Sequence, residues 1–240
     1  MAKKTIKIAH LYYDILNLYG ENGNVRALVK YLEKHGVKVV VEFLSLEDQI
    51  KFEDYDFVYI GSGTIENILL VLEDLKKYAD EIKNAINNGV SFLITGDSLA
   101  MFGKKFVDEK HKYDGLGIFD YVAKRIDFRI LGDQFYECPY IEQKVIGFQN
   151  RETVIDEYNG ESLFNVTKGT GYKPNIKQEG IIKNNFWGTY SLGPLLVRNP
   201  YLNEYLVKKL MEKNKIKYSP IEKDISYKAY EEYWNNFGEN

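Results

Sequence analysis

The sequence predicts an α/β protein with a flavodoxin-like, open and mostly parallel sheet, helices on both faces and an antiparallel extension. Strand-like and helix-like segments alternate over residues 5–102, and the connections between them are short. After residue 103, short strand-like segments follow one another without helices between them. The chain has 240 residues, 45% of them hydrophobic, so we expect one large domain over residues 1–240.

The first part of the chain predicts strands joined by helices. Short apolar or β-branched runs indicate strands, and apolar residues at every third or fourth position indicate helices. The predicted strands cover 5–9, 37–44, 57–60 and 90–94, and the predicted helices cover 24–35 and 68–75. Because parallel strands need crossover connections, this alternation predicts parallel pairing with helices on both faces.

The second part predicts short strands separated by Gly, Asn and Pro turns, and we expect them to extend the sheet in an antiparallel manner. These strands cover 124–130, 144–148, 180–183 and 186–190. A helix over 203–213 and a C-terminal helical segment at about 222–238 complete the chain. The C-terminal segment is rich in Tyr and Glu, so we expect it to pack on the domain or on a partner.

Composition excludes several classes of function. Lys and Arg number 32 against 35 Asp and Glu, so there is no basic excess for binding nucleic acid. The single cysteine, Cys138, suits a reducing compartment, and no apolar run is long enough for a membrane span or a signal peptide. The three histidines have no metal-ligand spacing. We therefore expect a cytoplasmic protein without a metal or a cofactor.

The most informative segment is 90–105, which predicts a buried strand that turns sharply into a helix. This is the shape of a nucleophile elbow, in which the residue at the strained turn carries the reactive group. The candidates at this turn are Thr95, Gly96, Asp97 and Ser98, and none of them is a cysteine.

Two other turns follow strand ends, where open parallel sheets bind their ligands. Gly61-Ser62-Gly63 leaves backbone amides accessible, as an oxyanion hole requires, although a tight strand-to-helix turn explains the same glycines. The loop after the first strand ends in Asn, Gly and Glu before a helix whose first amides could bind an anion. Capping of that helix by Asn22 or Asn24 explains this composition equally well.

Gly96-Asp97-Ser98-Leu99 spells the signature of the GDSL esterases and lipases, and residues 108–111 match their Asp-x-x-His pattern. This resemblance implies Ser98 as nucleophile and His111 as base. In that family the two blocks lie near opposite ends of the chain, whereas here both fall within residues 96–111. A GDSL-type serine hydrolase is therefore the lesser alternative.

A broader resemblance covers residues 6–220. It rests on six segments in a consistent order: 16–20 (LNLYG) with 23–24 (GN), 60–63 (IGSG), 102–105 (FGKK), 115–118 (GLGI), 146–150 (IGFQN), and 188–190 (GTY) with 193–194 (GP). Through them the chain resembles the class I glutamine amidotransferases of the cobyric acid synthase (CobB/CobQ) type, and among these the GatD-type subunits of lipid II isoglutaminyl synthase.

The resemblance implies a chemistry and a partner. In this family a cysteine at the elbow attacks the side-chain amide of glutamine, and a histidine late in the chain acts as base. Backbone amides of a Gly-rich turn stabilise the oxyanion, and ammonia passes to a ligase. For the GatD-type subunits this partner is a MurT-like ligase of cell-wall precursor amidation.

Individual residues carry over from the family as follows. Gly61 and Gly63, with Ser62 between them, match the oxyanion turn, and Arg129 matches a functionally important arginine. The remaining candidates for binding a small molecule such as glutamine are Asn17, Tyr19, Asp97, Ser98 and Asn150.

Two positions depart from the family pattern: Gly96 stands at the nucleophile and Leu192 at the histidine. Glycine cannot form a thioester and leucine cannot transfer a proton, so the sequence predicts a retained fold without glutaminase activity. An active amidotransferase with unusual residues remains an alternative, using Asp97, Ser98 or, with the elbow shifted by one, Thr95.

A rebuilt dyad is a remote alternative. It would have to combine Cys138 with one of the histidines, His10, His35 or His111, all of which lie in the first half of the chain. We expect Cys138 to be a small buried apolar residue instead.

Overall fold

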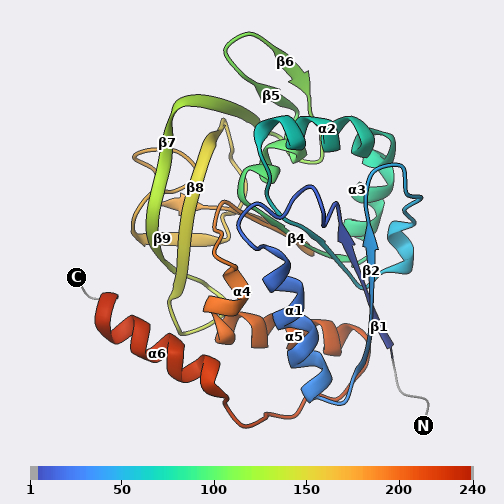
Figure 1. Ribbon diagram of the computed structural model, residues 1–240, viewed down its shortest axis with the longest axis vertical. Coiled ribbons are helices and arrows are strands. Elements are labelled where there is room, and N and C mark those ends of the chain that lie inside the picture. Colours follow the sequence, from blue (N-terminus) through green and yellow to red (C-terminus); the bar gives the residue numbers. More distant parts are fainter. Residues whose placement is uncertain (1–4, 239–240) are drawn as a thin grey trace.

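The structure is a computed structural model that describes residues 5–238. Within these residues two six-stranded sheets form the framework (Figure 1). The first sheet has the order β11-β12-β4-β3-β1-β2. Its strands are β1 (Thr5–Leu11), β2 (Lys38–Leu44), β3 (Phe57–Ile60), β4 (Ser91–Thr95), β11 (Ile181–Lys183) and β12 (Phe186–Thr189). All neighbouring pairs are parallel except β11 with β12, so the predicted α/β class is confirmed.

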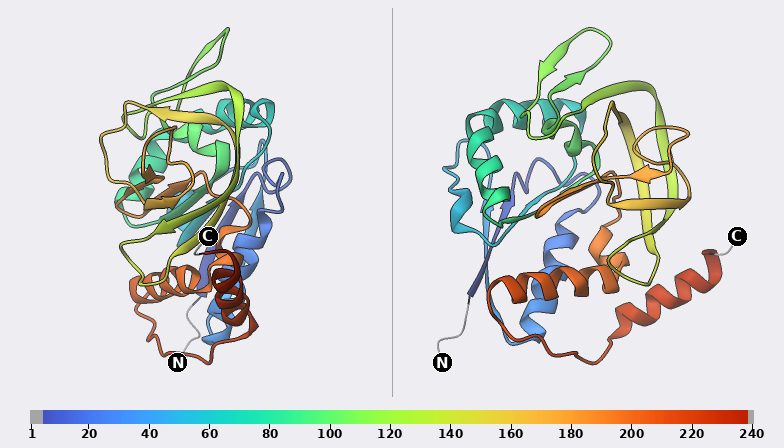
Figure 2. Two further views of the ribbon diagram at one scale, coloured as in Figure 1. Left: turned by 90° about the vertical axis from the view of Figure 1, so that its left-hand side faces the viewer. Right: turned by 180° about the vertical axis from the view of Figure 1, so that it is seen from behind.

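Helices cover both faces of the first sheet, as the sequence predicts (Figure 2). On one face lie α1 (Asn22–Lys34), α4 (Leu195–Arg198) and α5 (Pro200–Lys213), and on the other lie α2 (Ile65–Leu75) and α3 (Ala79–Asn87). Strand β3 shows why both faces are apolar: Val58 and Ile60 join the core under α2 and α3, while Phe57 and Tyr59 join the core under α1 and α5.

The second sheet stands beside the first (Figure 1). Its order is β10-β9-β7-β5-β6, and β8 pairs with β7. Its strands are β5 (Lys105–Val107), β6 (Lys112–Asp114), β7 (Val122–Glu137), β8 (Val145–Asp156), β9 (Phe164–Lys168) and β10 (Gln178–Glu179). Most of its pairs are antiparallel, and β5 runs parallel to β7.

This arrangement corrects the expectation that the strands after residue 103 extend the first sheet. The segments 124–130 and 144–148 belong to the long hairpin β7–β8, which forms a sheet of its own. The segment 186–190 contains β12, which runs parallel to β4 because the whole second sheet serves as the crossover between them. Within the first sheet only β11 is an antiparallel addition among the described strands.

The chain ends in α6 (Ile225–Phe237), which matches the helical segment expected there and packs on the molecule. Its Tyr227 and Tyr230 are buried, and their rings meet the Tyr201 ring edge-on. Short 3₁₀ helices cover Phe52–Asp54, Lys76–Tyr78 and Gly96–Phe102. Across residues 5–238, no helix combines the length and the apolar character that crossing a bilayer demands.

Candidate functional site

Gly96 lies at the turn where β4 enters the 3₁₀ helix Gly96–Phe102, with a positive φ of 65°. This left-handed conformation is the strained backbone of an elbow, and glycine adopts it without steric cost. The position is filled from two sides. A Cβ on Gly96 would collide with Ser62 Oγ, and would lie 2.5 Å from Ser62 Cβ and 2.7 Å from Leu192 Cδ2. The structure thus brings positions 62, 96 and 192 together and leaves no space for a side chain at 96.

Ser62 also accepts the hydrogen bond of the backbone amide that follows Gly96. The Asp97 amide N–H donates to Ser62 Oγ across 3.1 Å, and Ser62 is 2% exposed. The amide that follows a nucleophile at an elbow is a usual donor of an oxyanion hole. Here that donor is satisfied inside the protein.

The glycines that flank Ser62 have a packing explanation. A Cβ on Gly61 would collide with Leu16 O, and a Cβ on Gly63 would lie 2.7 Å from Leu16 Cδ2. The loop between β1 and α1 therefore presses on this turn, and Leu18 N donates to Ser62 O across 3.0 Å. Close approach of the two backbones, rather than ligand binding, requires glycine at 61 and 63.

Asp97 joins the elbow to the second sheet. Its buried carboxylate accepts hydrogen bonds from Thr153 Oγ1 at 2.6 Å, from Thr153 N at 3.2 Å and from Glu152 N at 3.3 Å. Burial raises the pKa of Asp97, and the hydrogen bonds from Thr153 and Glu152 and the charge of Arg151 oppose that shift. Asp97 is therefore fully engaged in holding β8 on the elbow.

Ser98 lies in the core. Its hydroxyl is buried and has no hydrogen-bond partner in the described part of the chain. His111, the base that a GDSL-type mechanism would use, is exposed on the turn between β5 and β6, where its ring lies 3.7 Å from Asp108 Oδ1. A serine hydroxyl without an adjacent base is not an activated nucleophile, so the geometry does not support the hydrolase alternative.

A buried carboxylate lies behind the elbow. Glu21 is 0% exposed and accepts hydrogen bonds from Thr95 Oγ1, from Tyr59 OH at 3.0 Å and from Gly193 N at 3.3 Å. Burial raises the pKa of Glu21, and the bonds from Thr95, Tyr59 and Gly193 oppose the shift. Thr95 is thus committed to a structural bond, and Glu21 ties the elbow to the backbone next to Leu192.

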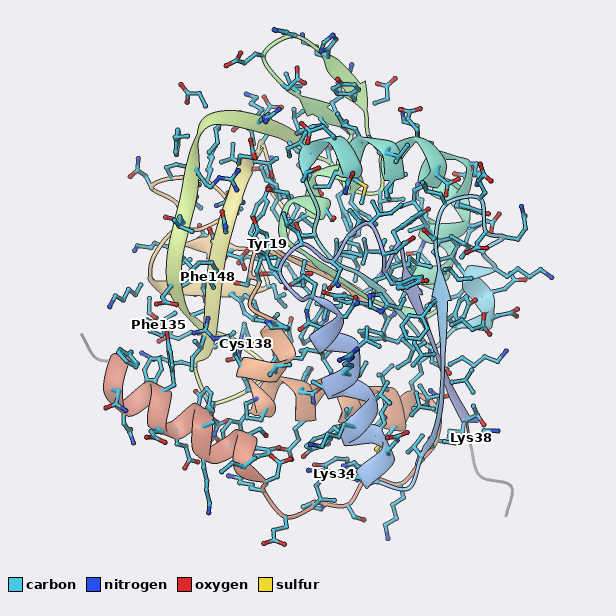
Figure 3. All side chains as sticks on the ribbon, in the orientation of Figure 1. Tyr19, Lys34, Lys38, Phe135, Cys138 and Phe148 are labelled. Atoms are coloured by element: carbon cyan, nitrogen blue, oxygen red, sulfur yellow. The ribbon has the colours of Figure 1, made fainter. Side chains whose placement is uncertain are left out.

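The remaining predicted binding residues divide into two groups. Tyr19 lies on the loop before α1, on the side that faces β7 and β8 (Figure 3). Burial raises the pKa of Tyr19, and the nearby charge of Arg129 opposes this shift. Arg129 donates to Asn150 Oδ1 at 2.9 Å and to Glu152 Oε1 at 2.7 Å. These side chains therefore surround one partly exposed rim. Asn17 instead accepts from Asn22 N at 2.9 Å, a bond that holds the start of α1.

No cysteine and histidine pair replaces the missing groups within residues 5–238. Cys138 is buried beyond the end of β7, and burial raises the pKa of its thiol, which disfavours the thiolate. His10 is 0% exposed, and burial lowers its pKa to about 4. The His35 ring packs in a tilted orientation against the rings of Tyr31 and Tyr218.

The structure also contains a buried ionic group that the sequence patterns do not reveal. Arg151 is 0% exposed, lies 3.9 Å over the Tyr190 ring centroid and donates to Gln149 Oε1 at 2.9 Å. Glu179, also 0% exposed, accepts from Tyr190 N at 2.7 Å and from Thr189 Oγ1 at 2.8 Å. The charges of Asp97 and Glu179 act on the Arg151 guanidinium in this buried region.

We expect Glu179 to make the stability of the fold depend on pH. Burial raises its pKa from 4.5 to about 7, against the opposing hydrogen bonds from Tyr190 and Thr189 and the charge of Arg151. A carboxyl group whose pKa is higher in the folded state than in the unfolded state stabilises the fold. This contribution is complete when the pH lies below the unfolded-state pKa, and it is lost as the pH rises through the folded-state pKa of about 7. It amounts to about 3 kcal/mol at most. We expect Glu179→Gln to remove this dependence on pH, because an amide does not titrate. The substitution should keep the local packing, because the amide nitrogen can donate to Thr189 Oγ1 and the amide oxygen can accept from Tyr190 N.

Urea unfolding between pH 5 and pH 8 tests this expectation. The stability of Glu179→Gln relative to the unaltered chain should rise with pH over this range, whereas the exposed control Glu142→Gln should show a constant difference. Asp97 and Glu21 add slopes of the same sign to every variant, so only the difference is informative. A Glu179→Gln difference that does not change with pH would contradict the assignment.

The chain matches the CobB/CobQ-like glutamine amidotransferase domain over residues 7–200. It is 32% identical over 220 residues to the GatD subunit of the glutamine-hydrolysing lipid II isoglutaminyl synthase of Staphylococcus aureus, covering 91% of this chain and 90% of that protein. The GatD subunit of the same enzyme from Streptococcus pneumoniae is also 32% identical, over 95% of this chain and 86% of that protein.

The fold has counterparts among solved structures. The glutaminase domain of CTPS from Trypanosoma brucei, with bound acivicin, aligns with a TM-score of 0.57 and 11% identity over 92% of this chain and 98% of that one. The resemblance inferred from the short segments is therefore confirmed by similarity over nearly the whole length. The chain belongs to the CobB/CobQ-like glutamine amidotransferase family.

Proposed function

We propose that this chain is an amidotransferase subunit that has lost glutamine hydrolysis and keeps its fold to hold a MurT-like ligase partner in cell-wall precursor amidation. The observation that carries the proposal is the filled position at the elbow. Gly96 supplies no nucleophile, Leu192 supplies no base, and Ser62 and Leu192 together take the space in which a thiol would stand.

The oxyanion donor supports the same proposal. A tetrahedral intermediate needs amide donors directed at its developing charge, and these must be free when substrate arrives. In this chain the Asp97 amide already donates to Ser62 Oγ. The departures therefore form a consistent set: nucleophile, base and one oxyanion donor are absent or occupied, while the surrounding glycines and the buried carboxylates maintain the backbone.

The relatives support the proposed partner. The S. aureus and S. pneumoniae proteins are named as subunits of lipid II isoglutaminyl synthase, and this chain aligns with most of each. We propose the same kind of assembly here, in the cytoplasm, with residues 1–240 acting as one domain. The two largest hydrophobic clusters each combine residues of both sheets, which supports the single domain.

Ammonia release from glutamine tests the loss of hydrolysis. The purified chain, alone and with its co-expressed MurT-like ligase, should release no more ammonia than a protein-free sample, while S. aureus GatD with its own ligase serves as the active control. Release that disappears in Asp97→Asn or Ser98→Ala would instead establish an active amidotransferase with unusual residues. Co-purification of the ligase with the tagged chain tests the scaffolding role, and failure to form a complex would contradict it.

A further inference from the structure

A groove of about 320 Å³ runs along α1, between that helix, the segment of α4 and α5, and the start of α6. Its floor is apolar, with Ala27 and Tyr31 from α1, and Val197 and Pro200 from the opposite side. Val197, on α4, is 49% exposed. An apolar side chain left open inside a groove is a feature of surfaces that bind a partner.

One edge of the groove carries a row of positive charge. Arg26, Lys30 and Lys34 are spaced one helical turn apart on α1, so they lie on the same face. Lys34, at the end of α1 in Figure 3, is paired with Asp224. Arg26 and Lys30 have no carboxylate within ion-pair distance in residues 5–238. Two adjacent unpaired cations beside an apolar floor match a ligand that presents apolar and acidic groups together.

One end of the groove lies close to the segment that follows Leu192. A Cβ on Gly23, at the first turn of α1, would lie 3.1 Å from Pro194 Cβ and 3.4 Å from Val197 Cγ2. Pro194 follows Leu192 by two residues, and Gly193 N donates to Glu21. A segment bound in the groove would therefore contact Leu196 and Val197, which follow Leu192 by four and five residues.

We propose that this groove binds an acidic amphipathic helix of the partner ligase, with two carboxylates one turn apart against Arg26 and Lys30 and apolar side chains against Val197 and Tyr31. A helix fits this groove because Arg26 and Lys30 are one helical turn apart, as carboxylates on one face of a bound helix would be. The apolar floor runs alongside these cations and can receive the apolar face of the same helix. This assignment rests on the proposed scaffolding role and names the surface that performs it.

The test compares charge-reversal variants of the full chain for binding to the MurT-like ligase by calorimetry. Arg26→Glu/Lys30→Glu should weaken the complex about tenfold or more and remove most of its dependence on salt. The control Lys51→Glu/Lys83→Glu makes the same change in net charge at exposed residues near α3, on the opposite face, and should leave binding unchanged. Val197→Asp, which changes the floor and not the cations, should also weaken the complex.

The outcomes separate the two levels of the proposal. If the ligase binds the unaltered chain and all variants equally, the groove assignment is wrong and the scaffolding role stands. If the ligase does not bind the unaltered chain, both are wrong. Vesicles containing phosphatidylglycerol provide the third comparison: binding to them that Arg26→Glu/Lys30→Glu abolishes, with ligase affinity unchanged, would assign the groove to a membrane surface and overturn the peptide assignment.

Discussion

Arg151→Met is expected to lower the free energy of unfolding by about 3–5 kcal/mol, which corresponds to a fall in Tm of about 10 °C for a chain of this size. Arg151 donates to Gly171 O at 2.6 Å, to Tyr172 O at 3.3 Å, to Thr153 O and to Gln149 Oε1. Methionine keeps an unbranched apolar stem, but it is shorter than arginine and has no group that could donate to any of them. Buried carbonyl groups without a donor cost free energy, and two buried carboxylates lose their nearby positive charge.

A matched surface arginine separates this effect from a general loss of charge. Arg125 pairs with Glu152 at 2.8 Å on the partly exposed side of β7, and Arg125→Met should cost less than about 1 kcal/mol. Urea unfolding of the three proteins at pH 7 measures both values. A similar small loss for the two variants would show that Arg151 does not hold the second sheet on the elbow.

The part of the first sheet formed by β1 to β4 was predictable because these strands are short, rich in apolar residues and separated by amphipathic helices. The strand predicted at 57–60 is β3 itself, the one predicted at 37–44 begins one residue before β2, and the one predicted at 90–94 is shifted by one residue from β4. The second sheet was not predictable as a separate body. Local patterns indicate that residues 124–130 are extended, but they do not indicate whether the next strand pairs with β4 or with β5.

The site shows the same limit for side chains. The sequence alone could place Gly96 and Leu192 at the family's nucleophile and histidine positions, because the matched segments have the family's spacing. The structure places these two residues beside each other. Gln149, Arg151 and Thr153 could not be found, because polar residues at alternate positions of a strand normally indicate the solvent face. In β8 that face is turned inward on the elbow, where hydrogen bonds and a cation–π contact satisfy it.

The geometry at the elbow indicates which substitutions would supply the groups that glutamine hydrolysis needs. Ser62→Gly/Gly96→Cys/Leu192→His is expected to gain ammonia release from glutamine, at least about 100-fold above the same protein with Leu192 kept, which is the contribution of a positioned general base. Ser62→Gly removes the atoms that a Cβ at 96 would strike and frees the Asp97 amide. A histidine at 192 would stand beside the new thiol, because the Leu192 side chain now contacts that point.

The strained backbone already present favours this result, because residue 96 has the positive φ of an elbow and a cysteine there costs only about 1–2 kcal/mol of backbone strain. Iodoacetamide labelling provides a second readout: the thiol introduced at position 96 should react quickly, while the buried Cys138 reports the background. Ser62→Gly/Leu192→His with Gly96 retained is the matched control and should release no ammonia. If the triple variant keeps its Tm and circular dichroism but its new thiol is unreactive and no ammonia forms, substitutions at three positions do not account for the loss. We would then expect the rim around Tyr19 and Arg129 also to differ from what glutamine hydrolysis requires.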